Sequence, residues 1–155
     1  MQLVLHNIRS VHNVGSIFRT ADAAGVSKIF LSGYTPLPVD RFKLPRKDFA
    51  KVSLGAEETI PWEQAKTLSA AIKKLKKENY HIVAVEQDKK SVSVFDFKLP
   101  KNKPVALVLG NEVLGLSKSA LALCDSIVEI PMHGKKESLN VSVAAGIALF
   151  ALSLS

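Results

Sequence analysis

Short apolar runs alternate with stretches of helical periodicity along the whole chain. Residues 3–5, 28–31, 81–86, 105–109 and 127–130 form apolar runs of the length that is typical of buried strands. Strands that alternate with helices indicate an α/β fold with a largely parallel sheet flanked by helices. A chain of 155 residues can bury one substantial core, so we expect a single domain over residues 1–155.

Two segments between these runs show the spacing of a helix with one apolar face. The first has apolar residues at positions 14, 17, 18 and 21, and it predicts a helix with Asn13 as N-cap and Gly25 as its end. The second predicts a helix over residues 62–77, with apolar residues at 65, 68, 72 and 75 and lysines outward. We expect short helical turns after Gly115 and a last helix from about Leu139. Residues 32–59, broken by three prolines and two glycines, predict a long functional loop.

The charge of the chain favours a polyanionic partner. Lys and Arg number 21 against 14 Asp and Glu, a formal net charge of +7, which suits nucleic acid or an anionic membrane. One cysteine, Cys124, excludes an internal disulfide and is interpreted as a core thiol, and the four histidines lack zinc-site spacing. With no apolar stretch of signal-peptide length at the N-terminus, we expect a metal-free cytoplasmic protein. The uncharged residues 138–155 predict a helix that is buried in a core or in a subunit interface rather than a membrane span.

Three segments carry residues with chemical potential. In residues 13–22, Arg19 lies about 140° around the helix from Val14. It could pair with Asp22 at i+3 on the surface, or it could be presented to a phosphate or sugar. In residues 105–117, a buried strand ends in a turn where Gly110 would let a ligand approach the backbone, and Glu112 is either solvated or functional. The glycine spacing fits neither a P-loop nor a dinucleotide fingerprint.

The third segment, residues 130–146, joins a strand end, a polar loop and an apolar helix. Ser138 and Asn140 stand at the helix entry, where their side chains could cap the helix or meet a ligand. The run Ile130-Pro131-Met132 offers backbone groups and an apolar wall that suit a purine ring. This junction therefore predicts a small-ligand site.

Together, these segments resemble in order and spacing the three signature motifs of the SpoU (TrmH-like) family of RNA ribose methyltransferases, within the SPOUT superfamily. The resemblance implies an α/β domain with a C-terminal deep trefoil knot that binds S-adenosylmethionine, and it implies a homodimer with a shared active site. Matching family positions would make Gly110, Ile130 and Leu139 cofactor-binding through their backbone, with Leu109 and Met132 beside them. The same matching assigns catalytic positions to Asn13, Arg19, Glu112, Ser138 and Asn140.

The resemblance also implies methyl transfer to a ribose 2′-hydroxyl of RNA, with tRNA expected ahead of rRNA. Because a guanidinium stays protonated, we expect Arg19 to hold the RNA phosphate and stabilise the developing alkoxide rather than act as a simple base. Many family members carry a separate N-terminal RNA-binding domain, which we do not recognise here, and Leu114 replaces a polar or basic residue. RNA contacts would then come from Arg41, Arg46, Lys47 and Lys135. A non-catalytic RNA-binding module or assembly factor is the alternative.

Overall fold

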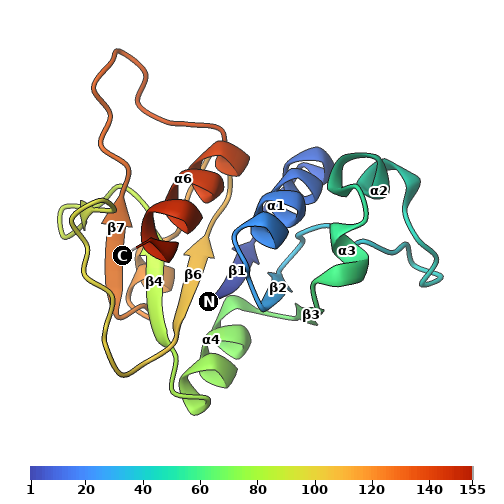
Figure 1. Cartoon of the computed structure of the whole chain (residues 1–155), viewed down its shortest axis with the longest axis horizontal. Coiled ribbons are helices and arrows are strands. Elements are labelled where there is room, and N and C mark those ends of the chain that lie inside the picture. Colours follow the sequence, from blue (N-terminus) through green and yellow to red (C-terminus); the bar gives the residue numbers. More distant parts are fainter. Residues whose placement is uncertain (155) are drawn as a thin grey trace.

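Seven parallel strands form the centre of the molecule, in a computed structural model that describes residues 1–154 (Figure 1). They are β1 (Gln2–His6), β2 (Lys28–Ser32), β3 (Trp62–Ala65), β4 (His81–Val85), β5 (Val92–Ser93), β6 (Val105–Leu109) and β7 (Ser126–Glu129). The strand order is β3-β2-β1-β6-β4-β7-β5, and every pairing is parallel. This confirms the expected parallel sheet.

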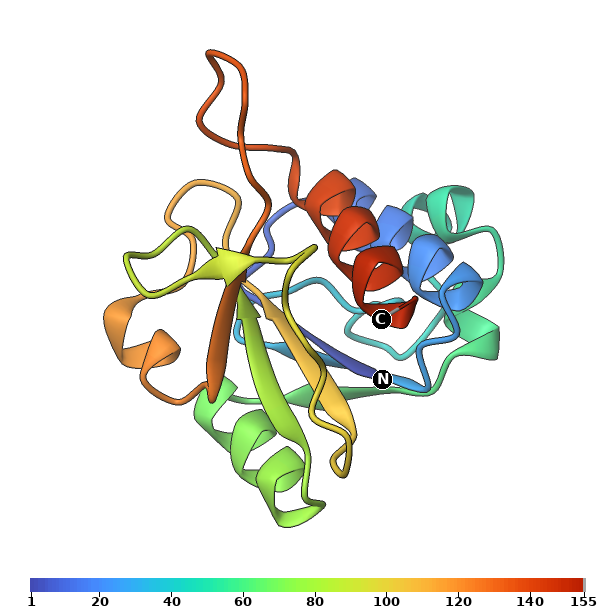
Figure 2. The same cartoon turned by 60° about the vertical axis from the view of Figure 1, so that its left-hand side comes forward.

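Helices cover both faces of this sheet (Figures 1 and 2). They are α1 (Val11–Ala23), α2 (Lys47–Ser53), α3 (Ala56–Thr59), α4 (Leu68–Lys77), α5 (Lys118–Leu121) and α6 (Val141–Ser153). One hydrophobic core contains residues of α1, α2, α3 and α6, and a second contains residues of α4 and α5. Strand residues alternate between the two cores: Leu3 and Leu5 lie in the first, and Val4 lies in the second. Because both faces are buried, the strands appear in the sequence as continuous apolar runs.

The first helix is where its apolar spacing predicts it, but its N-cap is different. Ser10 is the N-cap, and its hydroxyl accepts a hydrogen bond from the Asn13 backbone N–H at 3.1 Å. The prediction of Asn13 as N-cap was therefore wrong, which leaves the Asn13 side chain available for other contacts. At the other end Gly25 adopts φ +72°, a left-handed conformation that glycine accepts without strain and that ends the helix.

Two other predictions need correction. Residues 62–65 form strand β3 rather than the first turn of a helix, and α4 begins only after Thr67, whose hydroxyl caps it. Residues 32–59 are not one irregular loop, because they contain α2 and α3, and Phe49 of α2 packs edge-on against Phe18 at 5.2 Å. The last helix begins at Val141, close to the expected start near Leu139, and Asn140 stands at its entry as predicted. The short strand β5 had no clear signal in the sequence.

No helix within residues 1–154 is long and apolar enough to cross a membrane. The uncharged C-terminal stretch forms α6, which buries Ala145, Ala148, Leu149 and Leu152 in the core it shares with α1. Its other side remains exposed at Val143 and Phe150. The prediction of a buried helix is thus correct for one side of α6, while Ser155 lies outside the described residues.

Candidate functional site

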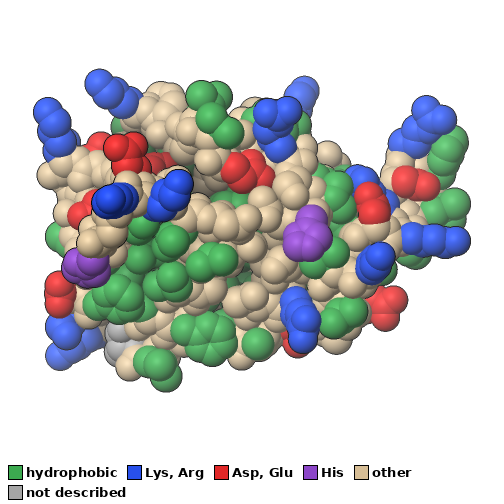
Figure 3. All heavy atoms as spheres, turned by 90° about the horizontal axis from the view of Figure 1, so that it is seen from above, with side chains coloured by type: hydrophobic (Ala, Val, Ile, Leu, Met, Phe, Trp, Pro, Cys, Tyr) green, Lys and Arg blue, Asp and Glu red, His purple; other side chains and the backbone are tan. Residues whose placement is uncertain are grey.

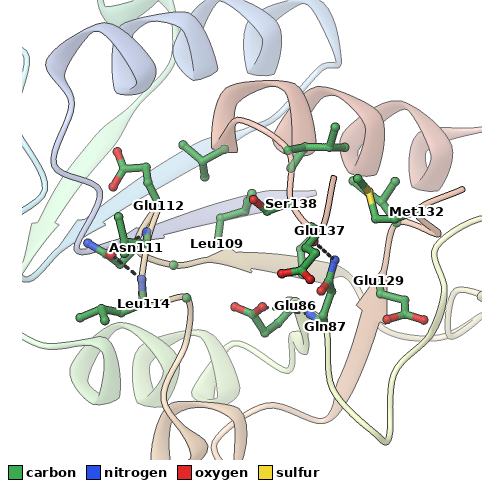
Figure 4. A pocket seen from close by; sticks show the side chains of 18 residues that line it. Glu86, Gln87, Leu109, Asn111, Glu112, Leu114, Glu129, Met132, Glu137 and Ser138 are labelled. Atoms are coloured by element: carbon green, nitrogen blue, oxygen red, sulfur yellow. Dashed lines mark hydrogen bonds between the residues drawn. The ribbon is translucent and has the colours of Figure 1, made fainter. Parts of the chain in front are cut away.

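A pocket of about 400 Å³ opens at the carboxyl ends of β4, β6 and β7 (Figure 4). Ligands of open α/β sheets bind at this edge, and the volume is that of a site for a molecule of nucleotide size. Three chain segments line it, around residues 85–87, 109–115 and 129–144. All five residues matched to cofactor positions line this pocket: Leu109, Gly110, Ile130, Met132 and Leu139.

The turn after β6 is held rigidly by the buried Asn111. Its side-chain amide donates to the carbonyl of Asn7 at 3.0 Å and to the hydroxyl of Tyr34 at 2.9 Å. Its side-chain oxygen accepts the backbone N–H groups of Val113 and Leu114. With every polar atom of the amide satisfied, Asn111 fixes the shape of the pocket wall.

Glu112 connects this turn to the start of α1. Its carboxylate accepts hydrogen bonds from the backbone N–H groups of Arg9 and Ser10 and from the Asn13 side-chain amide. Partial burial opposes ionisation, but these hydrogen bonds outweigh it and lower the pKa of Glu112. The interpretation of Glu112 as a solvated turn residue is therefore wrong.

The amides of Asn13 and Asn140 extend this network to the third segment. Asn140 donates to the Asn13 side-chain oxygen at 3.1 Å, while its own oxygen accepts the Ser142 N–H at 2.8 Å and so caps α6. Asn140 thus caps the helix and also meets the site. Ser138 lines the pocket, and its hydroxyl makes no hydrogen bond within residues 1–154. The hydrogen bonds from Asn140 to Asn13 and from Asn13 to Glu112 connect all three sequence segments.

Arg19 does not line this pocket. It is exposed on α1, where it borders a separate depression with His12, Lys51 and Asp48, whose carboxylate is paired with Arg46. The ion pair with Asp22 is not formed, since the Asp22 carboxylate accepts the Thr59 hydroxyl at 2.9 Å and Arg19 has no acidic partner within residues 1–154. The guanidinium is therefore available to an external anion.

Acidic side chains gather at one end of the pocket, and sequence reasoning did not single them out. Glu86, Glu129 and Glu137 line this end around Gln87 (Figure 4), and Lys135 and Lys136 border the hollow that adjoins it. Glu86 accepts the Leu116 N–H at 2.9 Å, and Gln87 donates to the Glu137 carbonyl at 2.7 Å. The available signal was position, because Glu86 and Gln87 directly follow β4 at the edge where ligands bind.

The residues expected to contact RNA lie in two regions of the molecule: Arg41, Arg46 and Lys47 are at or just before the start of α2, and Lys135 is on the loop before α6 (Figure 1). Arg41 lies over the ring of Phe42 at 4.8 Å, and Arg46 forms an ion pair with Asp48 at 2.8 Å. Lys47 is exposed at the start of α2, and Lys135 lies on the exposed loop before α6. Within one chain, therefore, these residues do not form one continuous patch.

Metal-binding and thiol chemistry find little support. Among residues 1–154, no group of three or more His, Cys, Asp or Glu side chains could hold a metal ion. Cys124 is half-buried against the α4 and α5 core. Burial, together with the nearby charge of Asp125, raises the pKa of its thiol to about 11, so it is a poor nucleophile.

A parallel α/β domain with a nucleotide-sized pocket at the carboxyl ends of its strands is typical of proteins that bind a nucleotide-like cofactor. Comparison of the sequence with protein families specifies the class further. The chain belongs to the SpoU rRNA Methylase family, whose model matches residues 1–150.

Several relatives share most of this chain. It is 36% identical over 149 residues to the 23S rRNA (guanosine-2′-O-)-methyltransferase RlmB of Ralstonia nicotianae, covering 96% of this chain and 56% of that protein. The AdoMet-bound rRNA methyltransferase from Sinorhizobium meliloti superposes with a TM-score of 0.86 at 32% identity, covering 97% of this chain and 54% of that one. The A. aeolicus TrmH/SpoU tRNA modifying enzyme gives 0.82 at 29% identity, covering 99% and 73%. The chain spans about half the length of the curated relatives it matches.

Proposed function

We propose that this protein transfers a methyl group from S-adenosylmethionine to a ribose 2′-hydroxyl of RNA. The observation that carries the proposal is the network in which Asn140, Asn13 and Glu112, one from each family-like segment, meet beside the pocket. Relatives named as RNA 2′-O-methyltransferases support the same reaction. A protein that only binds RNA would not need this combination of residues.

The pocket suits S-adenosylmethionine in size, polarity and charge. Ile130 and Met132 provide apolar surface for a purine ring, and the backbone at Leu109 and Gly110 is open to a ligand at the strand end. The carboxylates of Glu86, Glu129 and Glu137, on the same side of the pocket as Met132, favour a cation there. When bound, this cofactor supplies a methyl group that its positive sulfur already activates for transfer. The protein's part is then to orient the groups and to exclude water.

Arg19 would act on RNA that is bound at the pocket of a second copy of the chain. It lies outside the pocket of its own chain and has no described acidic partner, as a residue directed at another molecule's phosphate should. Its fixed charge would hold the RNA backbone and stabilise the alkoxide that develops on the 2′-oxygen. This assignment requires a homodimer.

An apolar surface over α6 supports that homodimer. Val143, Phe150 and Leu154 are exposed by 49%, 43% and 85%, and hydrophobic side chains gather over this region in the view from above (Figure 3). Since α6 packs beside α1, a second copy seated on α6 would also lie close to the helix that bears Arg19. A monomer at micromolar concentration in a sedimentation experiment would contradict the homodimer.

We also propose that the C-terminal portion is threaded as a trefoil knot. Two contacts support it: residues 86 and 87 bind both the turn after β6 and the loop before α6, so three chain segments that are distant in sequence meet around the pocket. The family resemblance supplies the expectation, because connections that thread through loops are otherwise nearly absent from proteins.

The relatives include enzymes that are named for two classes of RNA. The expectation of tRNA stays a prediction, while relatives named as 23S rRNA enzymes favour rRNA and the A. aeolicus relative is a tRNA modifying enzyme. A net charge of +7 suits either RNA. The proposed contact residues Arg41, Arg46 and Lys47 lie in one region and Lys135 in another, so an RNA that contacts all four must extend across the molecule.

Methyl transfer from labelled S-adenosylmethionine to unmodified tRNA and rRNA tests the proposal. Alkaline hydrolysis leaves 2′-O-methylated linkages uncut, so label in alkali-resistant dinucleotides would establish the reaction and the RNA class together. Arg19→Lys should lose at least about a hundredfold in turnover, because lysine lacks the planar fork of donors. RNA binding without any transfer to either RNA would favour the binding module instead.

A further inference from the structure

Few hydrogen bonds hold the segment between β7 and α6 in place. Residues 133–140 are all exposed, and the loop projects away from the rest of the molecule in both ribbon views (Figures 1 and 2). Within the described chain, a single hydrogen bond joins residues 131–139 to the rest of the protein: the Gln87 side-chain amide donates to the Glu137 carbonyl at 2.7 Å. This loop nevertheless supplies Glu137, Ser138 and Leu139 to the pocket wall.

Gln87 reaches the loop from a firmly held base. The neighbouring Glu86 carboxylate accepts the Gln87 N–H at 2.9 Å through one oxygen and the Leu116 N–H at 2.9 Å through the other. The end of β4 is thereby tied to the turn after β6. Gln87 links this fixed wall of the pocket to the exposed loop that forms the wall across from it (Figure 4).

The position of the hydrogen bond gives it a specific effect. A peptide unit is planar, so fixing the Glu137 carbonyl also fixes the direction of the Ser138 N–H. Leu139, the next residue, is one of the positions matched to cofactor binding. The orientation of both residues therefore depends on one exposed amide.

We propose that Gln87 is a positioning residue that latches residues 131–139 across the pocket and thereby sets the affinity for S-adenosylmethionine. The cofactor part of this proposal rests on the proposed function. The hydrogen bond between Gln87 and the loop does not depend on which ligand the pocket binds. Loss of one neutral hydrogen bond of this kind should weaken cofactor binding about three- to tenfold.

Two measurements on the full chain test the latch, using Gln87→Ala and Gln87→Glu. Calorimetry gives the dissociation constant for S-adenosylmethionine, and limited trypsin digestion without ligand reports opening of the loop at Lys135 and Lys136. Gln64→Ala and Gln64→Glu are matched controls, because Gln64 is an exposed glutamine on β3 at the far edge of the sheet. Both Gln87 variants should bind more weakly, show a raised KM for cofactor and be cut faster, while the controls behave as wild type.

The outcomes separate the latch from the proposed function. If wild type and Gln87→Ala bind S-adenosylmethionine equally, the latch is overturned. If the wild type does not bind it at all, the proposed function fails, and the trypsin comparison then decides the latch by itself. In that case faster cleavage of Gln87→Ala at Lys135 and Lys136 supports the latch, and equal cleavage overturns it.

Discussion

At the scale of single residues, Glu112 shows how one side chain can join distant parts of the sequence. Its carboxylate binds the backbone N–H groups of Arg9 and Ser10, about a hundred residues earlier in the chain and just before α1. Backbone N–H groups near a helix start attract an anion, which explains the choice of a carboxylate there. The contact positions the turn after β6 against α1 and so shapes one wall of the pocket.

Glu112→Gln should therefore destabilise the protein by about 1–2 kcal/mol at neutral pH, since charge-assisted hydrogen bonds become neutral ones. Urea unfolding measures this loss. Glu58→Gln is the matched control, because Glu58 is exposed on α3 and makes no described side-chain contact. A Glu112→Gln protein as stable as Glu58→Gln would show that the hydrogen bonds contribute little.

The pKa of Glu112 predicts how this contribution depends on pH. Its pKa in the folded protein is lowered from the ordinary value, so folding favours the ionised form. The stabilisation is complete above the unfolded pKa of about 4.3 and is lost as the pH falls through the lower folded pKa. The difference in unfolding free energy between wild type and Glu112→Gln should thus shrink from about pH 5 downward. A difference that grows on acidification would contradict this sign.

The sequence predicted the positions of some site residues correctly and missed others. The family resemblance implied that Gly110, Ile130 and Leu139 share a cofactor pocket, and all three line one pocket at the edge where the ends of parallel strands meet. Spacing could not predict that Ser10 rather than Asn13 caps α1, since both residues are good caps and only packing decides between them. Glu86 and Gln87 were missed because their contacts are tertiary and leave no periodic signal.

At the scale of elements, the β3 to α4 junction shows where periodicity misleads. Apolar residues at 65, 68, 72 and 75 fit one helical face, yet Ala65 is buried from a strand that pairs with β2. The Thr67 hydroxyl accepts the Ala70 N–H at 3.1 Å and begins α4 there. Thr67→Ala should cost about 1 kcal/mol in unfolding free energy, whereas Thr67→Ser should stay near wild type because it keeps the cap. Equal losses in the two variants would exclude capping as the cause.

The turn between β6 and α5 depends on glycine for two separable reasons. Gly115 has φ +63°, and a Cβ atom added there would overlap the Glu86 carboxylate that holds the Leu116 N–H. Gly25 has a similar φ of +72° but open space around it, so Gly25→Ala measures the backbone strain alone. Gly25→Ala should cost about 1–2 kcal/mol, and Gly115→Ala should cost more.

Thermal or urea unfolding of both variants gives the difference that arises from the contact. Adding Glu86→Ala to Gly115→Ala removes the overlapping carboxylate, so the double variant should show less than the sum of the two single losses. Strict additivity would mean that Gly115 and Glu86 do not interact through this overlap. Pocket geometry depends on the same pair, so cofactor binding should fall in Gly115→Ala while Gly25→Ala retains it.

At the scale of the whole molecule, the sequence predicted the layers but not the order of the strands. Continuous apolar runs separated by helical segments require a sheet buried on both faces, as observed. The placement of β6 between β1 and β4 depends on long crossovers, which no local pattern encodes. That placement is what brings the β4, β6 and β7 ends together and creates the pocket.

The apolar side of α6 gives the last prediction, which concerns assembly. Phe150→Lys places a charge on the exposed face of α6 and should convert the proposed homodimer to monomers, because an unpaired charge is costly in a buried interface. Phe95→Lys is the control, since Phe95 is 61% exposed on the loop between β5 and β6. Sedimentation should show a dimer for wild type and Phe95→Lys and a monomer for Phe150→Lys.

Activity of the same variants would then test whether the site needs two chains. Phe150 does not line the pocket, so the Phe150→Lys monomer should still bind S-adenosylmethionine with nearly the affinity of wild type. It should nevertheless lose methyl transfer, because Arg19 of a second copy could no longer reach the RNA at the pocket. A second test mixes two variants that both keep Phe150: Arg19→Lys and the pocket variant Glu112→Gln. Mixed dimers would contain one site with an intact Arg19 and an intact pocket, so part of the activity should return. A monomeric variant with full turnover would show that each chain carries a complete site and that Arg19 acts within its own chain.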